Sequence, residues 1–506
     1  MLKSFKNPIM SGFFPDPSIV RVEKDYYMVN STFQYFPSII ISHSKDLVNW
    51  EHIGHVITKS EWLDLSRVND SCGVWAADIS YWQGVYYIFY SVITGEKGNT
   101  KSENYIVKSK TPEGPYSKPI KIWDGGFDPS HFIDDDGTHY MLINKGAKII
   151  RLNSECTKAE SKPVTLWEGS TGLSPEGPHL FKKDGYYYIV LAEGGTGWRH
   201  RITSARSKNL YGPYEESPHN PVLMQKDPDA PIQKTGHGKL FSAYDGSWWV
   251  VYLCSRPNSD RFCALGRETC LSPVSWTEDG WFIINEGKGP SEKHIAPDTG
   301  AQTRKQDYSD DFSADRLGAQ WQFVRNPNND MWSLTERKGF LRIKTAAADT
   351  NSRDAQNIIL QRETQHRYTA VLKMEFKPEQ NNEQAGLICY YGTKNYIKLC
   401  LIYEDGAKIS LIENRAGDIS RVALTGEIKS NVIYLRVETK GKLRRFSHSL
   451  DGVAWDMVGE IEDCNFLSDE GIKDDFNFTG TMVGMYANNG GTGRTINADF
   501  CKFEVF

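Results

Sequence analysis

The sequence lacks a long apolar run and a block of basic residues. Its longest plainly apolar stretch, YYYIVLA at 186–192, is far shorter than the roughly 20 residues of a membrane-spanning helix. The net charge is −5 and no Lys/Arg cluster occurs, so the electrostatic footprint of a nucleic-acid or anionic-lipid binder is missing. We therefore expect no nucleic-acid partner and no membrane partner.

Paired cysteines and an apolar leader segment are also missing. The nine cysteines are odd in number and scattered without a C-x-x-C motif, which argues against a disulfide framework or a zinc ribbon. Free buried thiols are expected instead. The first residues, MLKSFKNPIMSGFF, contain no apolar segment typical of a secretory leader, so we expect a cytoplasmic protein. A leader removed beforehand would leave the same sequence.

Sustained helical periodicity is absent up to about residue 290, whereas Gly, Pro, Asn and Asp punctuate the chain about every ten residues. What is present is a repeated aromatic strand pattern. The segments are KDYYMV (24–29), GVYYIFY (84–90), GTHYML (137–142), GYYYIVLA (185–192) and GSWWVVYL (246–253). A second repeated pattern, which reads as a strand followed by a turn, occurs in ISHSKDLVNW (41–50), IVKSKTPEGPY (106–116) and TSARSKNLYGPY (203–214). These patterns indicate an all-β protein.

The repeat length indicates a propeller. About 50 to 60 residues separate successive aromatic strands, which accommodates four strands and their loops, and blades of this kind close into a ring. We predict a five-bladed β-propeller over residues 1–295. At 506 residues the chain exceeds a single compact core, so a second domain is expected over 308–506.

One polar residue precedes each aromatic strand by nine to twelve positions. The five are Asp16, Asp78, Asp128, Glu176 and His237. Equivalent positions in a propeller surround its axis, so these side chains are predicted to converge at one end of the central channel. Prolines beside three of the acids would fix their backbone, and Pro17 should push Asp16 towards extended geometry. Such rigidity suits catalysis.

Structural interpretations of the same residues stay open. The segment around Asp16 also fits a surface turn, and propellers carry polar residues that satisfy the backbone at the channel mouth. Asp78, in WAADIS, has no flanking proline, so a structural role is favoured for it. For His237 a packing role and a site role are equally compatible with the sequence.

These motifs together resemble glycoside hydrolase family 43, in particular its β-xylosidase and α-L-arabinofuranosidase branch with an added β-sandwich. The resemblance rests on NPIMSGFFPDPSIVRVEKDYYMVNSTFQYFP, SHSKDLVNW, GVWAADIS, GGFDPSHFIDDDG, SPEGPHLFKKDGYYYIVLAEGGTGWRH, TGHGKLF and LGRETCL. The match runs from about residue 7 to residue 290. One departure is WAAD where the family often has WAPD, which leaves the role of Asp78 open.

The resemblance implies an inverting hydrolase with three acids: Asp16 as the general base, Glu176 as the general acid, and Asp128 orienting Glu176 and tuning its pKa. It implies further substrate contacts: Phe33 and Trp75 as apolar walls, Arg267 and Thr196 as hydrogen-bonding groups, and His237 near the pocket floor. No cofactor is implied for the chemistry. A structural calcium beside His237 is a further implication of the resemblance.

Chemistry fits these roles. Inversion needs a protonated carboxyl at the leaving oxygen and an ionised one activating water on the opposite face of the ring. Asp16 belongs to the first repeat, Asp128 to the third and Glu176 to the fourth, so Asp16 should lie opposite Glu176. An ionised Asp128 would then raise the pKa of its neighbour Glu176.

The remainder of the chain indicates a second β-rich domain. SEKHIAPDTGAQTRKQD, around 291–307, is polar and weakly patterned, as in a linker. The short alternating segments that follow predict a jelly-roll, concanavalin-like β-sandwich. It either supports the propeller or caps the pocket. In the resembling branch a phenylalanine of such a domain reaches the active site, and here NFTGTMVG offers Phe478, with Phe476 as the alternative.

The resemblance thus implies an exo-acting enzyme that releases terminal xylose from β-1,4-xylo-oligosaccharides, with α-L-arabinofuranosidase side activity. An enzyme acting mainly on arabinofuranosyl branches is the alternative. A non-catalytic sugar-binding propeller needs no proton donor and is disfavoured by the three acids. A fructoside-cleaving propeller would retain configuration, and no motif supports it. The expected partner is a small oligosaccharide, and a homo-oligomer is compatible with the sequence.

Overall fold

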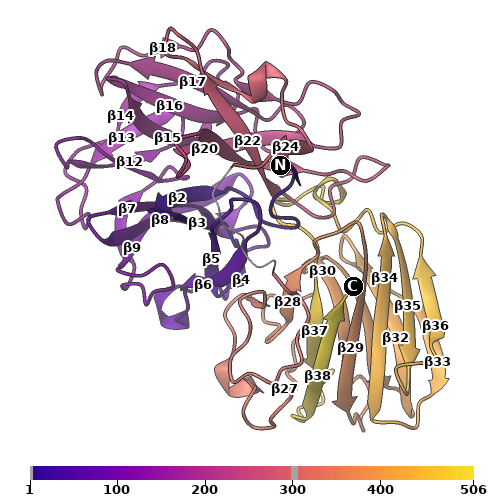
Figure 1. Cartoon of the computed structure of the whole chain (residues 1–506). Helices are drawn as coiled ribbons and strands as arrows, with labels where there is room; N and C mark the ends of the chain where they lie inside the picture. Colours follow the sequence, from indigo (N-terminus) through magenta and orange to yellow (C-terminus); the bar gives the residue numbers. More distant parts are fainter. Residues whose placement is uncertain (1–3, 298–305) are drawn as a thin grey trace.

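The computed structural model describes residues 4–297 and 306–506. It shows a propeller followed in sequence by a sandwich, with the early strands in indigo to rose and the later ones in orange to yellow (Figure 1). In those residues the only helices are four single 3-10 turns, η1 (Ser60–Trp62), η2 (Asn285–Gly287), η3 (Asn329–Met331) and η4 (Asp469–Gly471). No helix in this part of the chain has the length and apolarity needed to span a bilayer.

Five antiparallel sheets form the blades of the propeller, and each runs outward from an inner strand. Blade 1 has β2 (Ser18–Val22), β3 (Asp25–Asn30), β5 (Ser38–Ser44) and β6 (Glu51–Ile57); blade 2 has β7 (Gly73–Trp82), β8 (Val85–Glu96), β9 (Asn99–Ser109) and β10 (Ile120–Asp124). Blade 3 has β11 (Ser130–Ile133), β12 (His139–Ile143), β13 (Ala147–Arg151) and β14 (Val164–Trp167). Blade 4 has β15 (Glu176–Lys183), β16 (Tyr186–Glu193), β17 (Arg201–Ser207), β18 (Glu215–Glu216) and β19 (Leu223–Met224); blade 5 has β20 (Gln233–Ser242), β21 (Trp248–Ser255), β22 (Glu268–Trp276) and β23 (Phe282–Ile284).

The inner strands close a ring. Each of β2, β7, β11, β15 and β20 contacts the next, and β20 returns to β2. The two ends of the propeller also meet, because β1 (Ser4–Lys6) pairs antiparallel with β24 (Lys293–Ile295) outside the blades. The predicted five-bladed propeller is therefore confirmed.

The sequence repeat corresponds to the same two strands of each blade. The aromatic segments are β3, β8, β12, β16 and β21, the second strand in every sheet, and the second repeated pattern is the third strand in β5, β9 and β17. Their key side chains Tyr87, Tyr140, Tyr188 and Trp249 are buried in the cores of the blades. Aromatic and β-branched side chains pack well on pleated surfaces, so the repeat is a packing signal.

The sandwich packs an eight-stranded sheet on a seven-stranded one. The first contains, from one edge to the other, β33 (Asp418–Glu427), β32 (Ala407–Arg415), β31 (Asn395–Tyr403), β30 (Gln384–Gly392), β37 (Met482–Asn488), β28 (Ile359–Arg362), β25 (Gln322–Val324) and β4 (Tyr35–Phe36). The second contains β26 (Trp332–Ser333), β27 (Leu341–Lys344), β38 (Asn497–Val505), β29 (Arg367–Phe376), β34 (Val432–Lys440), β35 (Leu443–Ser449) and β36 (Asp456–Ile461). Apolar residues of both sheets form one buried core between them.

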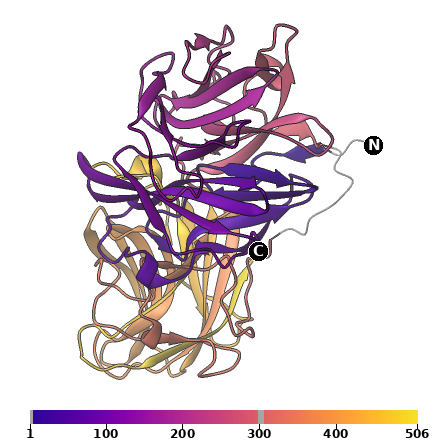
Figure 2. The ribbon, with the colours of Figure 1, turned by 90° about the vertical axis from the view of Figure 1, so that its left-hand side faces the viewer.

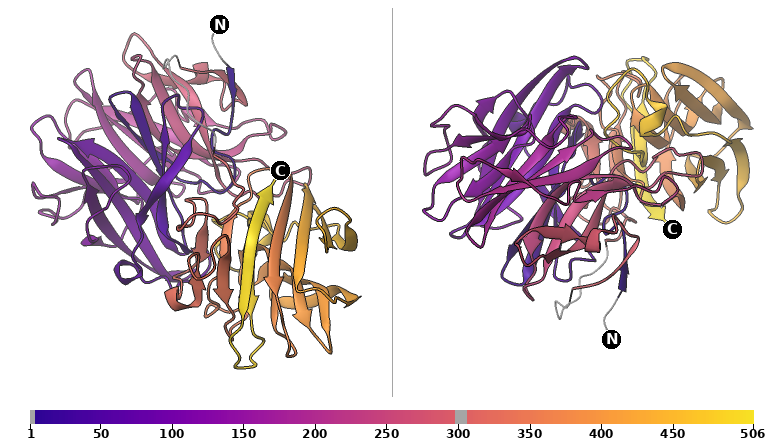
Figure 3. Two further views of the ribbon diagram at one scale, coloured as in Figure 1. Left: turned by 60° about the horizontal axis from the view of Figure 1, so that its bottom comes forward. Right: turned by 90° about the horizontal axis from the view of Figure 1, so that it is seen from above.

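The two domains are joined by a shared strand and by buried hydrogen bonds. Strand β4 lies in blade 1 by sequence, yet it pairs with β25 and so adds an edge strand to the sandwich. The buried guanidinium of Arg325 donates to the carbonyl oxygen of Val68 (2.9 Å) and to Asp70 (2.8 Å) across the junction. Viewed along the other directions, the sandwich lies against one side of the propeller (Figures 2 and 3).

The linker expected at 291–307 differs from the structure at its start. Residues 293–295 form β24, because pairing with β1 satisfies backbone groups that a free linker would leave to water. Residues 298–305 lie outside the described part. The expectation of free thiols is confirmed: all nine cysteines are unpaired, and eight of them are buried.

Candidate active site

The inner strands begin with a repeated backbone distortion that aims side chains into the channel. Just before each inner strand or within its first residues, a residue with a positive φ lies at the pocket end of the channel: Asp16 (51°), Ala76 (24°), Asp128 (55°), Gly177 (58°) and His237 (47°). The expected extended geometry of Asp16 is therefore wrong, although Pro17 follows it. Aspartate tolerates the left-handed region better than most residues, and such strain is characteristic of functional sites.

This ring also corrects the predicted equivalence of the five polar residues. Asp16, Asp128 and His237 occupy the distorted position itself, whereas Glu176 lies one residue before it and Asp78 two residues after it. A bulge shifts the register of β7 between Trp75 and Asp78, and another shifts that of β15 between Glu176 and His179. Glu176 still faces the pocket, but Asp78 lies deeper in the channel.

A pocket of about 330 Å³ opens at this end of the channel. The pocket is lined by Asp16, Phe33, Trp75, Phe127, Asp128, Glu176, Thr196, His237, Arg267 and Phe478. The structure thus brings together the nine residues to which the resemblance gave a catalytic or substrate-binding role and adds Phe127, whereas Asp78 is not in the lining.

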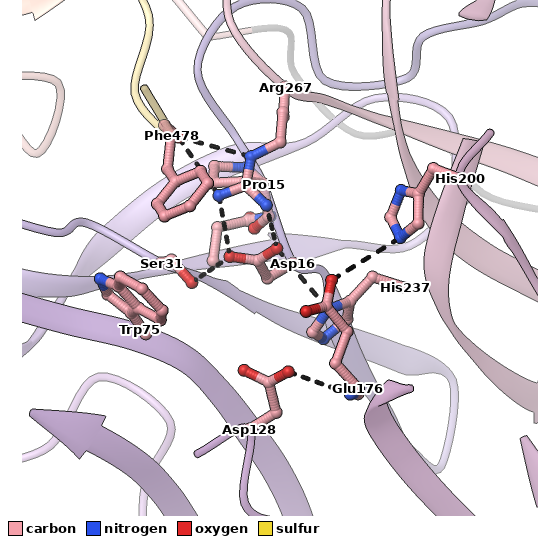
Figure 4. Close-up of polar contacts among 12 residues, drawn as sticks. Pro15, Asp16, Ser31, Trp75, Asp128, Glu176, His200, His237, Arg267 and Phe478 are labelled. Carbon is pink, nitrogen blue, oxygen red and sulfur yellow. Dashed lines mark hydrogen bonds and ion pairs between the residues drawn. The ribbon is translucent and has the colours of Figure 1, made fainter. Parts of the chain in front are cut away.

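Asp16 is held as an ion pair. Arg267 donates from Nη1 to Oδ1 (2.8 Å) and Ser31 donates from Oγ to Oδ2 (2.7 Å), while Nδ1 of His237 lies 3.7 Å from Oδ1 (Figure 4). Burial alone would raise the pKa of Asp16, but Arg267, His237 and Ser31 together lower it below its ordinary value. Asp16 is therefore the ionised acid of the site.

Asp128 and Glu176 resist ionisation. Burial comes first in raising the pKa of Glu176 to about 7; Arg267 opposes this rise and the charge of Asp16 adds to it. The pKa of Asp128 is raised well above its ordinary value by burial and then by Glu176 and Asp16, although Asp128 accepts the backbone N–H of Gly177 (3.0 Å). The expected cause was an ionised Asp128 acting on Glu176, but burial contributes most.

Aromatic rings form the pocket wall, and one of them comes from the sandwich. The ring of Phe478 lies 5.2 Å from Trp75 and 6.3 Å from Phe33, measured between centroids. Its carbonyl oxygen accepts a hydrogen bond from Nη2 of Arg267 (3.2 Å), and its backbone N–H donates to Ser71 (3.2 Å). Of the two candidates, Phe478 lines the pocket, whereas Phe476 packs edge-on against Trp75.

Asp78 belongs to a buried network of hydrogen bonds beneath the pocket. Lys239 donates to Asp78 Oδ1 (2.6 Å), to Ser18 Oγ (3.0 Å) and to the carbonyl oxygen of Ile79 (2.7 Å), and Ser18 also donates to Asp78 (2.6 Å). The second carboxylate oxygen accepts the backbone N–H of His131 (2.8 Å). With all its oxygens engaged, Asp78 holds the inner strands together, which is the structural role favoured by the sequence.

Comparison with known proteins agrees with this geometry. Residues 5–282 match the family described as "Glycosyl hydrolases family 43", and residues 309–505 match the "Beta xylosidase C-terminal Concanavalin A-like domain".

The chain belongs to glycosyl hydrolase family 43.

Solved and curated family 43 relatives match the chain end to end. The structure of the GH43 protein BlXynB from Bacillus licheniformis is 52% identical with a TM-score of 0.96, and each chain covers 100% of the other. A xylan β-1,4-xylosidase from Bacillus halodurans C-125 is 34% identical with a TM-score of 0.94, each chain covering 99% of the other. The non-reducing end α-L-arabinofuranosidase BoGH43B of Bacteroides ovatus is 36% identical over 99% of this chain and 94% of its own length.

Several supporting residues of this family 43 site escaped the sequence analysis. Ser31 holds Asp16, and the amide of Asn30 donates to the carbonyl oxygen of Pro15 (3.0 Å), which fixes the chain before the acid. Phe127 lines the pocket beside Asp128, and Nε2 of His200 lies 3.9 Å from Oε1 of Glu176. A polar Asn-Ser pair that ends an apolar strand was the available signal for Asn30 and Ser31. His200 had none.

The residues around His237 do not fit the calcium that the resemblance implied. Calcium takes six to eight oxygen ligands. Near His237, the carboxylate of Asp16 is bound by Arg267 and Ser31, and deeper in the channel the ammonium of Lys239 already neutralises Asp78. A cationic side chain of the protein therefore occupies the channel below the pocket.

Proposed function

We propose that the chain is an exo-acting, inverting glycoside hydrolase that releases terminal xylose from β-1,4-xylo-oligosaccharides, with α-L-arabinofuranosidase side activity. The observation that carries this proposal is the set of three carboxyl groups around one small pocket, of which one is ionised and two resist ionisation. The cluster of aromatic rings in the pocket wall suits a flat apolar face of a pyranose ring. The names of relatives include both activities, which supports the side activity.

The roles follow from the charges. Asp16, kept ionised by Arg267, serves as the general base that takes a proton from the attacking water. Glu176, with a pKa raised to about 7, carries the proton that the leaving oxygen requires. Asp128 binds the N–H of Gly177 next to Glu176 and so fixes the position of the acid. The three groups suffice, and no cofactor takes part in the hydrolysis.

Exo action follows from the wall contributed by the sandwich. Phe478 approaches Phe33 and Trp75 from a separate domain, so one side of the pocket is covered and a single terminal sugar fits best. Arg267 was expected to bind that sugar. In the structure its guanidinium pairs with Asp16 and the carbonyl of Phe478, so we assign it the task of keeping the base ionised and the wall in place.

A direct test uses two aryl glycosides and one natural substrate. Aryl β-D-xyloside should be hydrolysed with a higher kcat/KM than aryl α-L-arabinofuranoside, and the reverse order would favour the arabinofuranosidase alternative. Xylobiose should release xylose, and ¹H NMR of the aryl β-D-xyloside reaction in the first minutes should show α-xylose, since inversion of a β-linkage yields the α-anomer. The aryl substrate is used for this measurement because the reducing-end xylose of xylobiose is already a mixture of anomers. Initial β-xylose would contradict the inverting scheme, and no release of sugar would overturn the hydrolase proposal.

Metal removal should have no effect. Because Lys239 supplies the positive charge in the channel, treatment with EDTA is expected to leave kcat/KM and the melting temperature unchanged within error. The measurement is activity and thermal unfolding before chelation, after it, and after calcium addition. A loss that calcium restores would show that a cation binds here after all. A cytoplasmic location stays a prediction from the sequence, which leaves the oligomeric state open.

A further inference from the structure

His200 is a buried histidine beside Glu176 for which the mechanism above has no use. Its side chain has no exposed surface, and its Nε2 atom lies 3.9 Å from Oε1 of Glu176 (Figure 4). That nitrogen has no hydrogen-bond partner in the structure. A buried polar atom without a partner costs free energy, so an unpaired nitrogen aimed at an acid requires an explanation.

The other ring nitrogen decides which tautomer is present. Nδ1 of His200 lies 3.3 Å from the carbonyl oxygen of Lys234 and is hydrogen-bonded to it. A carbonyl oxygen only accepts, so Nδ1 carries the hydrogen, and in a neutral imidazole Nε2 then carries the lone pair. Burial, followed by the nearby His237, lowers the pKa of His200 to about 3, so the ring stays neutral. Glu176 therefore faces an acceptor.

A glycine in the neighbouring strand β20 makes space for the His200 ring in this orientation. Gly236 lies directly against the ring, because a Cβ built there would stand 2.4 Å from Nε2 and 2.5 Å from Cδ2 and Cε1. Any larger residue at 236 would displace the imidazole. His200 itself begins the turn into β17, where its backbone N–H donates to Gly197 (3.0 Å). The ring is thus fixed by the hydrogen bond at Nδ1 and by the close approach of Gly236, and its backbone is fixed by the bond to Gly197.

We propose that His200 is a positioning residue whose Nε2 lone pair accepts a hydrogen bond from the protonated carboxyl of Glu176 and so keeps the general acid protonated between turnovers. A protonated Glu176 gains a hydrogen bond to Nε2, whereas an ionised Glu176 would set a carboxylate against a lone pair. Rotation of the carboxyl about its last C–C bond then presents the proton to the leaving oxygen. This inference rests on the proposed function and names a further residue of the same site.

Other charged groups also act on Glu176. Asp16, ahead of β2, raises its pKa, and Arg267, ahead of β22, lowers it. Glu176 in turn raises the pKa of Asp128, ahead of β11, while His237 on β20 faces Asp16. All of these remain in place when only His200 is changed, so a variant at 200 isolates the contribution of the imidazole.

The test is the pH dependence of kcat/KM for His200→Phe, which keeps a flat ring but removes the acceptor. We expect the alkaline limb to move to lower pH by about one unit, the size of effect that one hydrogen bond has on a titrating group. The loss at pH 8 should reach about tenfold and largely vanish near pH 5.5. It should be larger for substrates with poor leaving groups.

Two further variants separate this effect from a general loss of packing. His200→Gln restores an acceptor oxygen of similar reach and should return the alkaline limb towards that of the wild type. His294→Phe, a buried histidine against Phe5 outside the pocket, is the matched control and should leave the profile unchanged. Should the phenylalanine variant fail to fold, His200→Met compared with His200→Gln makes the same measurement.

The outcomes are distinguishable. A wild-type protein without glycosidase activity would refute the proposed function before any variant is needed. An active wild type whose alkaline limb is the same in His200→Phe would overturn the role of His200 alone. A uniform loss of rate at every pH, equal in the Phe and Gln variants, would assign the residue to packing and overturn the inference as well.

Discussion

Replacing Asp16 with alanine is expected to abolish turnover of every substrate, whatever its leaving group. Asp16 is the ionised acid of the site, fixed by Arg267 at 2.8 Å and Ser31 at 2.7 Å, and no other group lining the pocket combines a lowered carboxyl pKa with that position. Loss of a general base costs about 10²- to 10⁴-fold in rate. The measurement is kcat with aryl xylosides of graded leaving-group pKa, which should fall equally across the series.

Stability must be separated from chemistry in this experiment. Removing Asp16 leaves Arg267 buried without its partner, and breaking a buried ion pair typically costs about 3–5 kcal/mol of folding free energy. Asp16→Asn, which keeps the shape, should be equally inactive. The matched control is Asp78→Asn, which breaks the buried pair with Lys239. It should lower the melting temperature but retain most of kcat; a control as inactive as Asp16→Asn would assign the loss to folding.

Most of the fold could be predicted because its signal is repeated and local. Five aromatic strands at similar spacing identify the blades, and in the structure Tyr87, Tyr140 and Tyr188 are buried on equivalent strands, the second in each sheet. The junction between the domains could not be predicted in this way. Strand β4 joins the sandwich through pairing with β25, nearly 300 residues away, and a two-residue strand has no sequence pattern of its own.

The candidate site also has residues that could be predicted from the sequence and features that could not. Motif by motif, the sequence placed Asp16, Asp128 and Glu176 at one channel end, and the structure brings them to one pocket. It missed the left-handed backbone of the two aspartates, since a following proline favours extended geometry and only the closed ring imposes the turn. It also missed His200, because the contact with Glu176 depends on how β15 and β17 lie across a blade.

Replacing Glu176 with alanine is expected to affect substrates unequally. Glycosides whose leaving group must be protonated, such as xylobiose, should lose about 10²- to 10⁴-fold in kcat/KM, whereas aryl glycosides with strongly acidic phenols should lose far less. The reason is that an activated phenolate departs without a proton. Glu176→Gln keeps the size of the side chain and should behave in the same way. Equal losses for good and poor leaving groups would contradict the acid assignment.

The pH profile supplies an independent check of the same residue. Because the pKa of Glu176 is raised to about 7, the acid is protonated below that pH, and wild-type kcat/KM should fall as the pH rises through about 7. Asp16 must be ionised, and its lowered pKa places the acidic limb well below neutrality, so the profile is bell-shaped. With an activated aryl substrate, Glu176→Ala should lose the alkaline limb and keep the acidic one. An alkaline limb that survives in this variant would show that another group donates the proton, and Asp128, whose pKa is also raised, would be the one to examine first.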